Sequence, residues 1–389
     1  MKIRFLILLV LLCIPLFSCS NLRNDEVSTK PNVKKTEDTD KPGKPESNKP
    51  LPSTTPVPNP VTPPAIPQDE LVIYNGPIEH IFFHPLIIDP KLAFDGDAMS
   101  KGYDDYFVTV KEFNKMIESL YLKNFILIKM SDLFQEQMIN GKVTLTKKEL
   151  KLPVNKKPLI FSIDDLNYYQ YMRENGNAHK LLIDEDGELA TYYKDIKGAE
   201  TISREQEIVP ILNSFVKEHP DFSFNGAKGI LALTGYEGIL GYRTHELSST
   251  NFSQEKAEAI RVVKKLKKDG WEFASHGYGH LDTKAISIGT LRVDTERWKK
   301  EVEALIGKTN IYIYPYGSSV LPGDAKFEAL RTYGFHIFCS VGPNPYLSNT
   351  DHYAMMDRVH IDGIGLRQQK HIMARFFNSD EVIDSVRNP

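Results

Sequence analysis

The strongest constraint on the fold is a repeated alternation of short apolar runs with amphipathic helical patterns. The apolar runs are His80–His84, Phe125–Ile128, Pro158–Ile163, Gly229–Leu233, Trp271–Ala274, Ile311–Tyr314 and His336–Ser340. Runs of this length with few polar residues are typical of parallel strands that are buried on both faces. Strands that alternate with helices form βα units around a parallel sheet. About seven strands predict an α/β fold with a closed or nearly closed barrel.

Helical patterns lie between these runs. Apolar residues recur at helical spacing in Lys111–Leu122, Ser253–Lys268 and Thr290–Leu305. In the second helix we expect Ser253 to be the N-cap and Gly270 to end the helix.

One polar segment, residues 176–227, interrupts the alternation, and Asp184–Gly187 has the composition of a turn. We interpret this segment as an insertion between the third strand and the next βα unit. Because it directly follows the best catalytic candidate, we expect it to form part of a substrate groove.

The first residues predict an exported chain. Lys2 and Arg4 precede the apolar run Phe5–Phe17, which has signal-peptide length and is too short to span a bilayer. The run ends in Leu16–Cys19, which resembles a bacterial lipobox; an ordinary secretory signal is the alternative. We therefore expect a signal peptide at residues 1–18, a lipid on Cys19, and an extracytoplasmic chain anchored to a bacterial membrane.

Residues 19–70 are predicted to be a disordered tether, because they are rich in Pro, Lys and Glu and nearly lack large apolar residues. The remaining residues, 71–389, suffice for one large barrel domain.

Cys13 would leave with the signal and Cys19 would carry lipid, so Cys339 has no disulfide partner. Any metal must therefore bind His and carboxylate ligands. The formal net charge of −3 gives no indication of nucleic-acid binding.

Two adjacent carboxylates, Asp164 and Asp165, follow the predicted strand Pro158–Ile163. The carboxyl ends of barrel strands carry the active sites of barrel enzymes, so both side chains can reach the mouth. Their mutual repulsion would be relieved by a cation or a shared proton. A helix N-cap or a simple turn is the alternative interpretation, since Asp serves both.

Two histidines four residues apart, His276 and His280, follow another predicted strand. Such a pair can face one ion, and an Asp with two His forms a facial ligand set with open positions. A third strand runs into Tyr314–Gly317, whose Pro and Gly suit a rigid loop that presents a backbone N–H to an oxyanion. A simple turn is the alternative there.

Together these motifs resemble the polysaccharide deacetylase family, also called the NodB-homology or carbohydrate esterase 4 family. Ser162–Asp165 matches its Asp-Asp motif. His276–His280 matches its His-Ser/Thr-x-x-His motif, with Gly277 where Ser or Thr is usual. Tyr314–Gly317 matches Arg-x-Pro-Tyr without the arginine, in a form similar to the poly-N-acetylglucosamine deacetylases. The resemblance covers about residues 78–365 apart from the insertion.

The resemblance implies a distorted (β/α)7 barrel that removes N-acetyl groups from an N-acetylglucosamine-containing cell-surface polysaccharide. It implies a divalent metal, Zn²⁺ first, with Co²⁺ or Ni²⁺ as alternatives. Asp164 would be the general base, and the metal ligands would be Asp165, His276 and His280. The backbone N–H of Tyr316 would stabilise the oxyanion, and Tyr314 and Pro315 would lie at the substrate.

The general acid is where the match weakens. The family's Leu-x-His element is matched by Arg358–His360, with Arg in place of Leu, so His360 is the candidate acid. His84, at the end of the first strand, is a candidate substrate-binding residue, and a structural hydrogen bond is its alternative role. Asp294 and Trp298 have the spacing of the family's Asp/Trp element, but they precede the third motif and are interpreted as helical.

The missing arginine helps to orient the catalytic Asp in the family, and Arg243 is the candidate that could replace it and line the sugar groove. Two other functions stay open. A non-catalytic glycan-binding lipoprotein could retain the barrel without the arginine. A glycoside hydrolase fits poorly, because its two carboxylates stand on separate elements across the bond. No protein partner can be inferred from the sequence.

Overall fold

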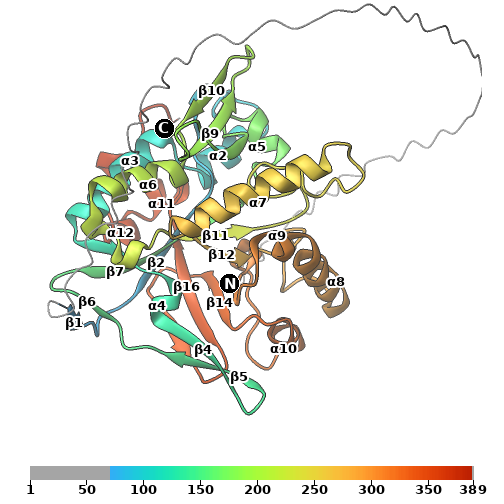
Figure 1. Cartoon of the computed structure of the whole chain (residues 1–389). Coiled ribbons are helices and arrows are strands. Elements are labelled where there is room, and N and C mark those ends of the chain that lie inside the picture. The colour runs from blue at the N-terminus through green and yellow to red at the C-terminus, as the bar shows by residue number, and fades with distance from the viewer. Residues whose placement is uncertain (1–70, 388–389) are drawn as a thin grey trace, which may run out of the picture. The chain divides into compact units, whose positions relative to one another are not determined.

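The computed structural model describes residues 71–387, which form a closed barrel of seven parallel strands (Figure 1). In ring order the strands are β2 (Glu79–Phe83), β7 (Lys157–Asp164), β11 (Ile230–Leu233), β12 (Glu272–Ser275), β13 (Ile311–Ile313), β14 (Ile337–Val341) and β16 (Ala354–His360). The ring closes because β2 pairs with both β16 and β7, and β7 also pairs with β11. The predicted α/β barrel is therefore confirmed.

One of the predicted strands lies outside this ring. The run at Phe125–Ile128 forms β3 (Phe125–Leu127), which pairs with Lys157–Leu159 at the start of β7, and Leu127 also forms a single bridge with Ser223. The same edge of β7 then pairs with β11 through Ser162–Asp164, so β3 cannot continue to the mouth. The seventh ring strand is β16, which contains Arg358 and His360.

The main helices cover the outside of the barrel. They are α3 (Val110–Leu122), α6 (Ile208–Glu218), α7 (Phe252–Lys268), α8 (Ile288–Trp298), α10 (Ala325–Thr332) and α11 (Gly363–Gln368). A capping box between Thr109 and Glu112 begins α3. The N-cap of α7 is Asn251, so the prediction of Ser253 was wrong, whereas Gly270 does follow the end of this helix, with φ 101°.

The predicted helix Thr290–Leu305 is interrupted by a π-helical turn at Lys299–Glu303 between α8 and α9 (Ala304–Ile306). The other helices are short: α1 (Pro90–Ala93), α2 (Ser100–Tyr106), α4 (Met130–Leu133), α5 (Gln170–Glu174), α12 (Lys370–Met373) and α13 (Ser379–Val382), with 3₁₀ turns at Pro220–Phe222, Phe224–Gly226 and Pro315–Gly317. Within residues 71–387, none of the helices has both the length and the apolar character needed to cross a bilayer.

The polar segment 176–227 contains a separate antiparallel sheet of β8 (Lys180–Ile183), β9 (Leu189–Lys194) and β10 (Glu200–Ser203). A turn joins β8 to β9, where the Asp184 carboxylate accepts from the N–H groups of Asp186 and Glu188. Helix α6 follows the sheet and leads to β11. The status of this segment as an insertion stays a prediction. The predicted signal, Cys19 and the tether lie outside the described residues.

The barrel has two different ends. Its interior is filled by apolar side chains such as Ile160, Ile230 and Cys339. At the end where the strands begin, which we call the base, this cluster includes residues of two small antiparallel ribbons. These ribbons are β4 (Phe134–Ile139) with β5 (Lys142–Lys147), and β1 (Leu71–Ile73) with β6 (Lys151–Pro153). A further strand, β15 (Leu347–Asn349), pairs with β16. The opposite end, where the strands finish, is the mouth.

Candidate active site

The two adjacent carboxylates lie at the mouth, at the end of β7. Asp164 is the last residue of the strand, and Asp165 takes a left-handed backbone conformation with φ 59°. This reversal turns two neighbouring side chains into one cavity, although successive residues of a regular strand face opposite sides. Both are almost fully buried. The turn conformation and the two buried charges thus occur together, and the charges need partners.

The partner of Asp164 is Arg358 on β16. Its guanidinium donates from Nη1 to Oδ1 at 2.7 Å and from Nη2 to Oδ2 at 2.9 Å, and it stacks on the ring of Phe82 at 4.0 Å. Burial raises the pKa of Asp164, but the Arg358 and His276 charges and the Arg358 hydrogen bonds outweigh it and hold this pKa well below its usual range. Asp164 is therefore an ionised carboxylate whose oxygens are held in place by Arg358.

This pair corrects the predicted role of Arg243. Arg243 donates to the backbone carbonyls of Glu237 and Tyr168 and does not reach Asp164. The signal that could have identified Arg358 was present in the sequence: an arginine inside the strand-like run Ala354–His360, next to Asp357 and two residues before a histidine. A buried arginine requires an anion, and Asp164 supplies it.

The three predicted metal ligands converge beside this pair. Asp165, His276 and His280 each offer one ligand atom within 4.8 Å of the others. His276 Nδ1 lies 2.8 Å from the carbonyl of Ile313, an arrangement that directs Nε2 into the site. Burial lowers the pKa of His276, so the ring is neutral, as a ligand must be. Two imidazole nitrogens and one carboxylate oxygen fit a divalent ion such as Zn²⁺.

Asp165 has its own support. The Tyr169 hydroxyl donates to Asp165 Oδ1 at 2.6 Å and contacts Thr234 Oγ1 at 2.5 Å, while Oδ2 lies 3.6 Å from His280 Nε2. Burial raises the pKa of Asp165, but the histidines, led by His280, lower it below its ordinary value overall. One carboxylate oxygen is thus fixed by the protein and the other faces the ligand cluster.

Asp294 on α8 holds the histidine loop, a role that the sequence analysis missed. Its carboxylate accepts from Tyr278 N–H at 2.7 Å and from Gly279 N–H at 2.8 Å. Gly277 has φ 67°, and a Cβ there would lie 3.1 Å from Asp294 Oδ2. Glycine therefore occupies the usual Ser or Thr position because the loop is left-handed and rests on this carboxylate. The helical interpretation of Asp294 and Trp298 is confirmed.

Two histidines on the other side of the cavity form a connected pair. His360 Nδ1 lies 2.8 Å from Asp362 Oδ2, and His360 Nε2 lies 3.1 Å from His84 Nδ1. His84 Nε2 lies 3.9 Å from Asp165 Oδ2, so His84 stands between His360 and the ligand cluster. Burial, with the His360 charge next, lowers the pKa of His84 to about 4.

These groups line a cavity of about 610 Å³ whose walls are largely aromatic. The aromatic lining residues are Phe82, Tyr106, Phe107, Tyr169, Tyr171, Tyr236 and Tyr316. Tyr316 has φ 59° and is 71 % exposed, and its ring lies 4.5 Å from that of His280. Tyr314 is fully buried, Pro315 is buried as well, and neither lines the cavity, so their contact with substrate stays a prediction that this cavity does not support.

A comparison with known protein families points to the same family as the sequence motifs. The family model for polysaccharide deacetylase matches residues 243–337, which contain His276, His280 and the Tyr314–Gly317 loop. The chain thus contains a region that matches the polysaccharide deacetylase family. The match ends before Arg358 and begins after Asp164, so the ion pair between them is known from the structure alone.

Solved deacetylases resemble the chain in fold at low sequence identity. Deacetylase PplD of Streptococcus pyogenes, in complex with acetate, is 13% identical with a TM-score of 0.43, over 74% of this chain and 93% of that chain. A de-N-acetylase from Aggregatibacter actinomycetemcomitans is 13% identical with a TM-score of 0.44, over 78% and 100%. The BpsB deacetylase domain from Bordetella bronchiseptica is 12% identical with a TM-score of 0.37, over 73% and 97%. No curated protein sequence matches the chain.

The buried ion pair predicts a large and specific stability effect. Arg358→Met leaves the Asp164 charge buried and unpaired, so we expect the free energy of unfolding in urea to fall by about 3–5 kcal/mol. Adding Asp164→Asn should recover part of this loss, because no charge then lacks a partner. Arg261→Met, which removes an exposed pair with Glu258, should cost less than about 1 kcal/mol. Equal losses for Arg358→Met and Arg261→Met would contradict the assignment.

The support of the histidine loop predicts an effect on metal affinity. An amide at position 294 accepts only one of the two backbone N–H bonds and turns its own NH₂ toward the other. We therefore expect Asp294→Asn to weaken Zn²⁺ binding by about 10–100-fold in competition with a chelating dye. Asp195→Asn is the matched control, since Asp195 also accepts from two backbone N–H groups, those of Lys197 and Ala199. Unchanged Zn²⁺ affinity in Asp294→Asn would refute the role.

Proposed function

We propose that the chain is a metal-dependent deacetylase that hydrolyses N-acetyl groups of an N-acetylglucosamine-containing cell-surface polysaccharide. The observation that supports this most strongly is the pairing of Asp164 with Arg358 directly beside the cluster of Asp165, His276 and His280. One carboxylate is thereby kept for proton transfer while the other is directed to a metal. A purely structural turn would not need two adjacent buried carboxylates with separate partners.

We assign the first proton transfer to Asp164. A divalent ion held by Asp165, His276 and His280 would polarise the acetamide carbonyl and lower the pKa of a water molecule. Asp164 Oδ2 lies 3.8 Å from His276 Nε2, so a water that attacks at the cluster is within reach of this carboxylate. Arg358 keeps Asp164 ionised and fixes the direction of its oxygens.

The oxyanion that forms on the acetyl group needs a donor, and we assign the backbone N–H of Tyr316. The left-handed conformation of Tyr316 follows Pro315 in a short 3₁₀ turn, and this turn holds the peptide at the rim of the cavity beside His280. A donor that is fixed before the reaction stabilises the transition state without reorganisation.

The departing amine needs a proton, and we assign its delivery to His84 with His360 behind it. Of the two histidines, His84 has the nitrogen nearer the ligand cluster, Nε2, whereas His360, which also lines the cavity, is tied to Asp362 and contacts His84. This arrangement changes the predicted roles. His84 becomes the proton donor, and His360, which the sequence analysis named as the acid, orients His84 and returns a proton to it. The low pKa of His84 makes its protonated form a strong acid.

The cavity walls favour a sugar polymer as substrate. Tyrosine and phenylalanine rings can stack on the apolar faces of pyranose rings, and both Tyr106 and Tyr316 are at least half exposed at the rim. The predicted signal and the lipid on Cys19 would place this cavity outside the cell, where acetylated polysaccharides are found. The alternative of a non-catalytic glycan-binding protein was motivated by the missing arginine and by the uncertain general acid, and Arg358 removes the first of these reasons.

Acetate release tests the proposed reaction. The chain from Ser20 onward should release acetate from N-acetylglucosamine oligomers when Zn²⁺ or Co²⁺ is added, and a chelator should abolish this release. Asp164→Asn should lower kcat by about 10²–10⁴-fold, because the base is lost, while metal binding is retained. His276→Ala should lose both metal and activity. A wild-type protein that binds metal and releases no acetate from any acetylated glycan would favour the glycan-binding alternative.

The order of the two histidines predicts a dependence on the leaving group. His84→Gln should lower amide hydrolysis by about 10²–10⁴-fold, and His360→Gln should lower it less, because His360 acts through His84. Hydrolysis of 4-nitrophenyl acetate should survive both changes, since 4-nitrophenolate leaves without a proton. His336→Gln, at the base, is the control and should change neither rate. Equal loss of ester and amide hydrolysis in His84→Gln would exclude it as the proton donor.

A further inference from the structure

The described fold begins at the base of the barrel, at the end opposite to the active site. Leu71 is the first residue of β1, and β1 pairs with β6 beside the bottom of the barrel interior. The cavity with Asp164 and Asp165 lies at the other end, where the strands finish. Figure 1 shows the same polarity, with β1, β6 and the β4–β5 hairpin at the lower end of the view and β9 and β10 at the upper end.

The base carries a lysine-rich segment that the active site does not use. Residues 134–157, which run from β4 to the start of β7, contain six lysines and two glutamates. The lysines are Lys142, Lys147, Lys148, Lys151, Lys156 and Lys157. All except Lys156 are exposed. The segment therefore presents a net positive strip along the base.

Structural roles account for only some of these lysines. Lys156 pairs with Asp221, Lys148 donates to the Ser131 carbonyl, and Lys157 lies over the ring of Phe125. Among the described residues, neither Lys142 nor Lys147 has an ion-pair partner. Basic residues at the end of α7 can stabilise that helix by offsetting its dipole. Lys142 and Lys147 lie on strand β5, so they have no such role.

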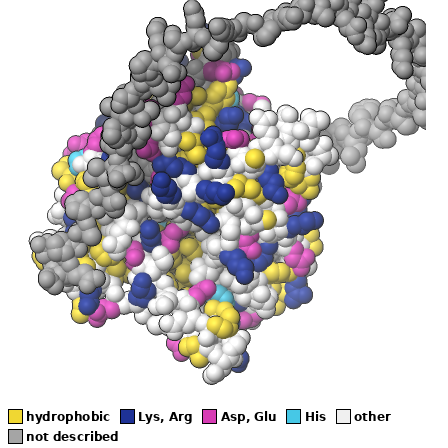
Figure 2. All heavy atoms as spheres, in the orientation of Figure 1, with side chains coloured by type: hydrophobic (Ala, Val, Ile, Leu, Met, Phe, Trp, Pro, Cys, Tyr) yellow, Lys and Arg dark blue, Asp and Glu magenta, His cyan; other side chains and the backbone are white. Residues whose placement is uncertain are grey.

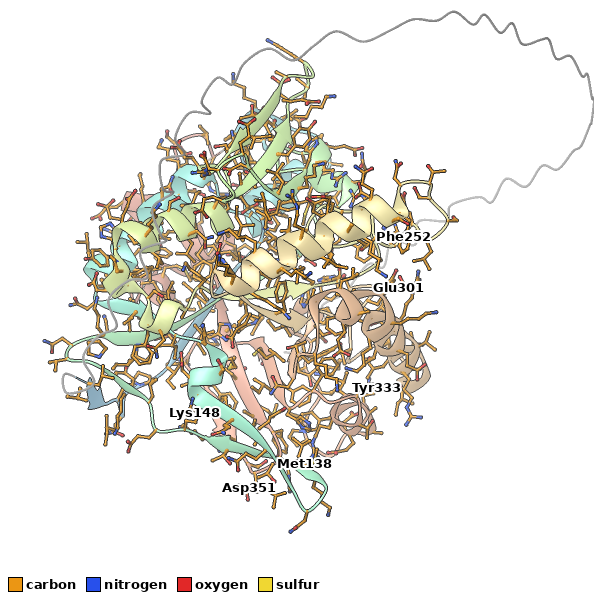
Figure 3. The ribbon with its side chains drawn as sticks, viewed as in Figure 1. Met138, Lys148, Phe252, Glu301, Tyr333 and Asp351 are labelled. Carbon is orange, nitrogen blue, oxygen red and sulfur yellow. The ribbon has the colours of Figure 1, made fainter. Side chains whose placement is uncertain are left out.

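Exposed apolar side chains accompany the lysines. At the hairpin, Met138 is 69 % and Ile139 48 % exposed, directly before the Asn140-Gly141 turn. At the ribbon of β1 and β6, Ile73 and Val154 are also about half exposed or more. Figure 3 shows Met138 on the outer part of the hairpin and Lys148 nearer the barrel, and the hairpin is anchored there by a bond from Leu145 N–H to the Asp351 carbonyl. Figure 2 shows hydrophobic and charged side chains intermingled on this lower part of the visible face.

We propose that the base of the barrel docks on a lipid bilayer with anionic headgroups. Lysines near such a surface are attracted to it, and a projecting pair of apolar side chains can enter the headgroup region. A soluble polyanion would use the lysines but would gain nothing from exposed Met138 and Ile139. A bilayer would use both, and the base is also the end of the barrel at which the described fold begins.

Docking in this orientation would direct the active site away from the membrane. The cavity would open toward polymer that lies outside the bilayer, and lipid-linked sugars at the membrane surface would not reach it. This inference rests on the base alone and is independent of the proposed hydrolysis.

Vesicle sedimentation tests the proposal. The probe is vesicles of equal parts phosphatidylcholine and phosphatidylglycerol, with phosphatidylcholine vesicles as the neutral reference. The protein is the chain from Ser20 onward, so that no lipid anchor contributes. We expect binding only to the anionic vesicles and a loss of binding as salt rises. Lys142→Gln with Lys147→Gln should weaken it by about 25-fold, since each lysine contributes about fivefold.

Further variants separate the contributions of the apolar side chains and of the lysines to vesicle binding. Met138→Ser with Ile139→Ser should weaken vesicle binding severalfold, and its remaining binding should still depend on salt. Lys194→Gln with Lys197→Gln removes two lysines from the β9–β10 region and should leave binding unchanged. Unchanged thermal unfolding would show that each variant is folded. Equal weakening by the two lysine pairs, or binding to soluble polyphosphate without binding to vesicles, would overturn the proposal.

Discussion

The active site depends on one buried ion pair, that between Arg358 and Asp164. Arg358 stands on β16 and reaches past Phe82 of β2 to Asp164 on β7, so the pair exists only because the ring of strands closes. Beneath it, Ser162 Oγ lies 3.2 Å from Arg358 Nη1 and 3.0 Å from His80 Nε2. A charge at this depth is tolerated only with such partners. The pair therefore links barrel closure to the protonation state of the proposed base.

Around this pair, the mouth concentrates unusual backbone conformations. Asp165, His280 and Tyr316 all have φ between 51° and 59°, although none of them is glycine. Such residues cost free energy, and they persist where surrounding contacts fix them. Tyr169 fixes Asp165, and Asp294 fixes the loop that ends at His280. These three residues are among those that we assign to metal binding and oxyanion stabilisation, so their fixed backbone conformations help to set the site geometry in advance.

The sequence predicted the parts of the site that follow strands in order. Asp164, Asp165, His276 and His280 were found because each set comes directly after an apolar run, and carboxyl ends of parallel strands meet at one edge. The role of Arg358 was missed, because Arg358 comes from a distant segment and contacts Asp164 only in the closed ring. The role of Asp294 was missed, because it depends on how α8 packs on the loop that precedes it. The same limit explains β3 and β16: an apolar run shows a strand, but pairing along β7 decides which strands enter the ring.

The most direct test of the central claim is a crystal structure of the Zn²⁺-bound protein, with the ion located by its anomalous scattering. We expect the ion to be bound by Asp165, His276 and His280, with Asp164 still paired to Arg358 and not coordinated. An ion coordinated by Asp164, with Arg358 displaced from it, would contradict the division of roles between the two carboxylates on which the proposed mechanism rests.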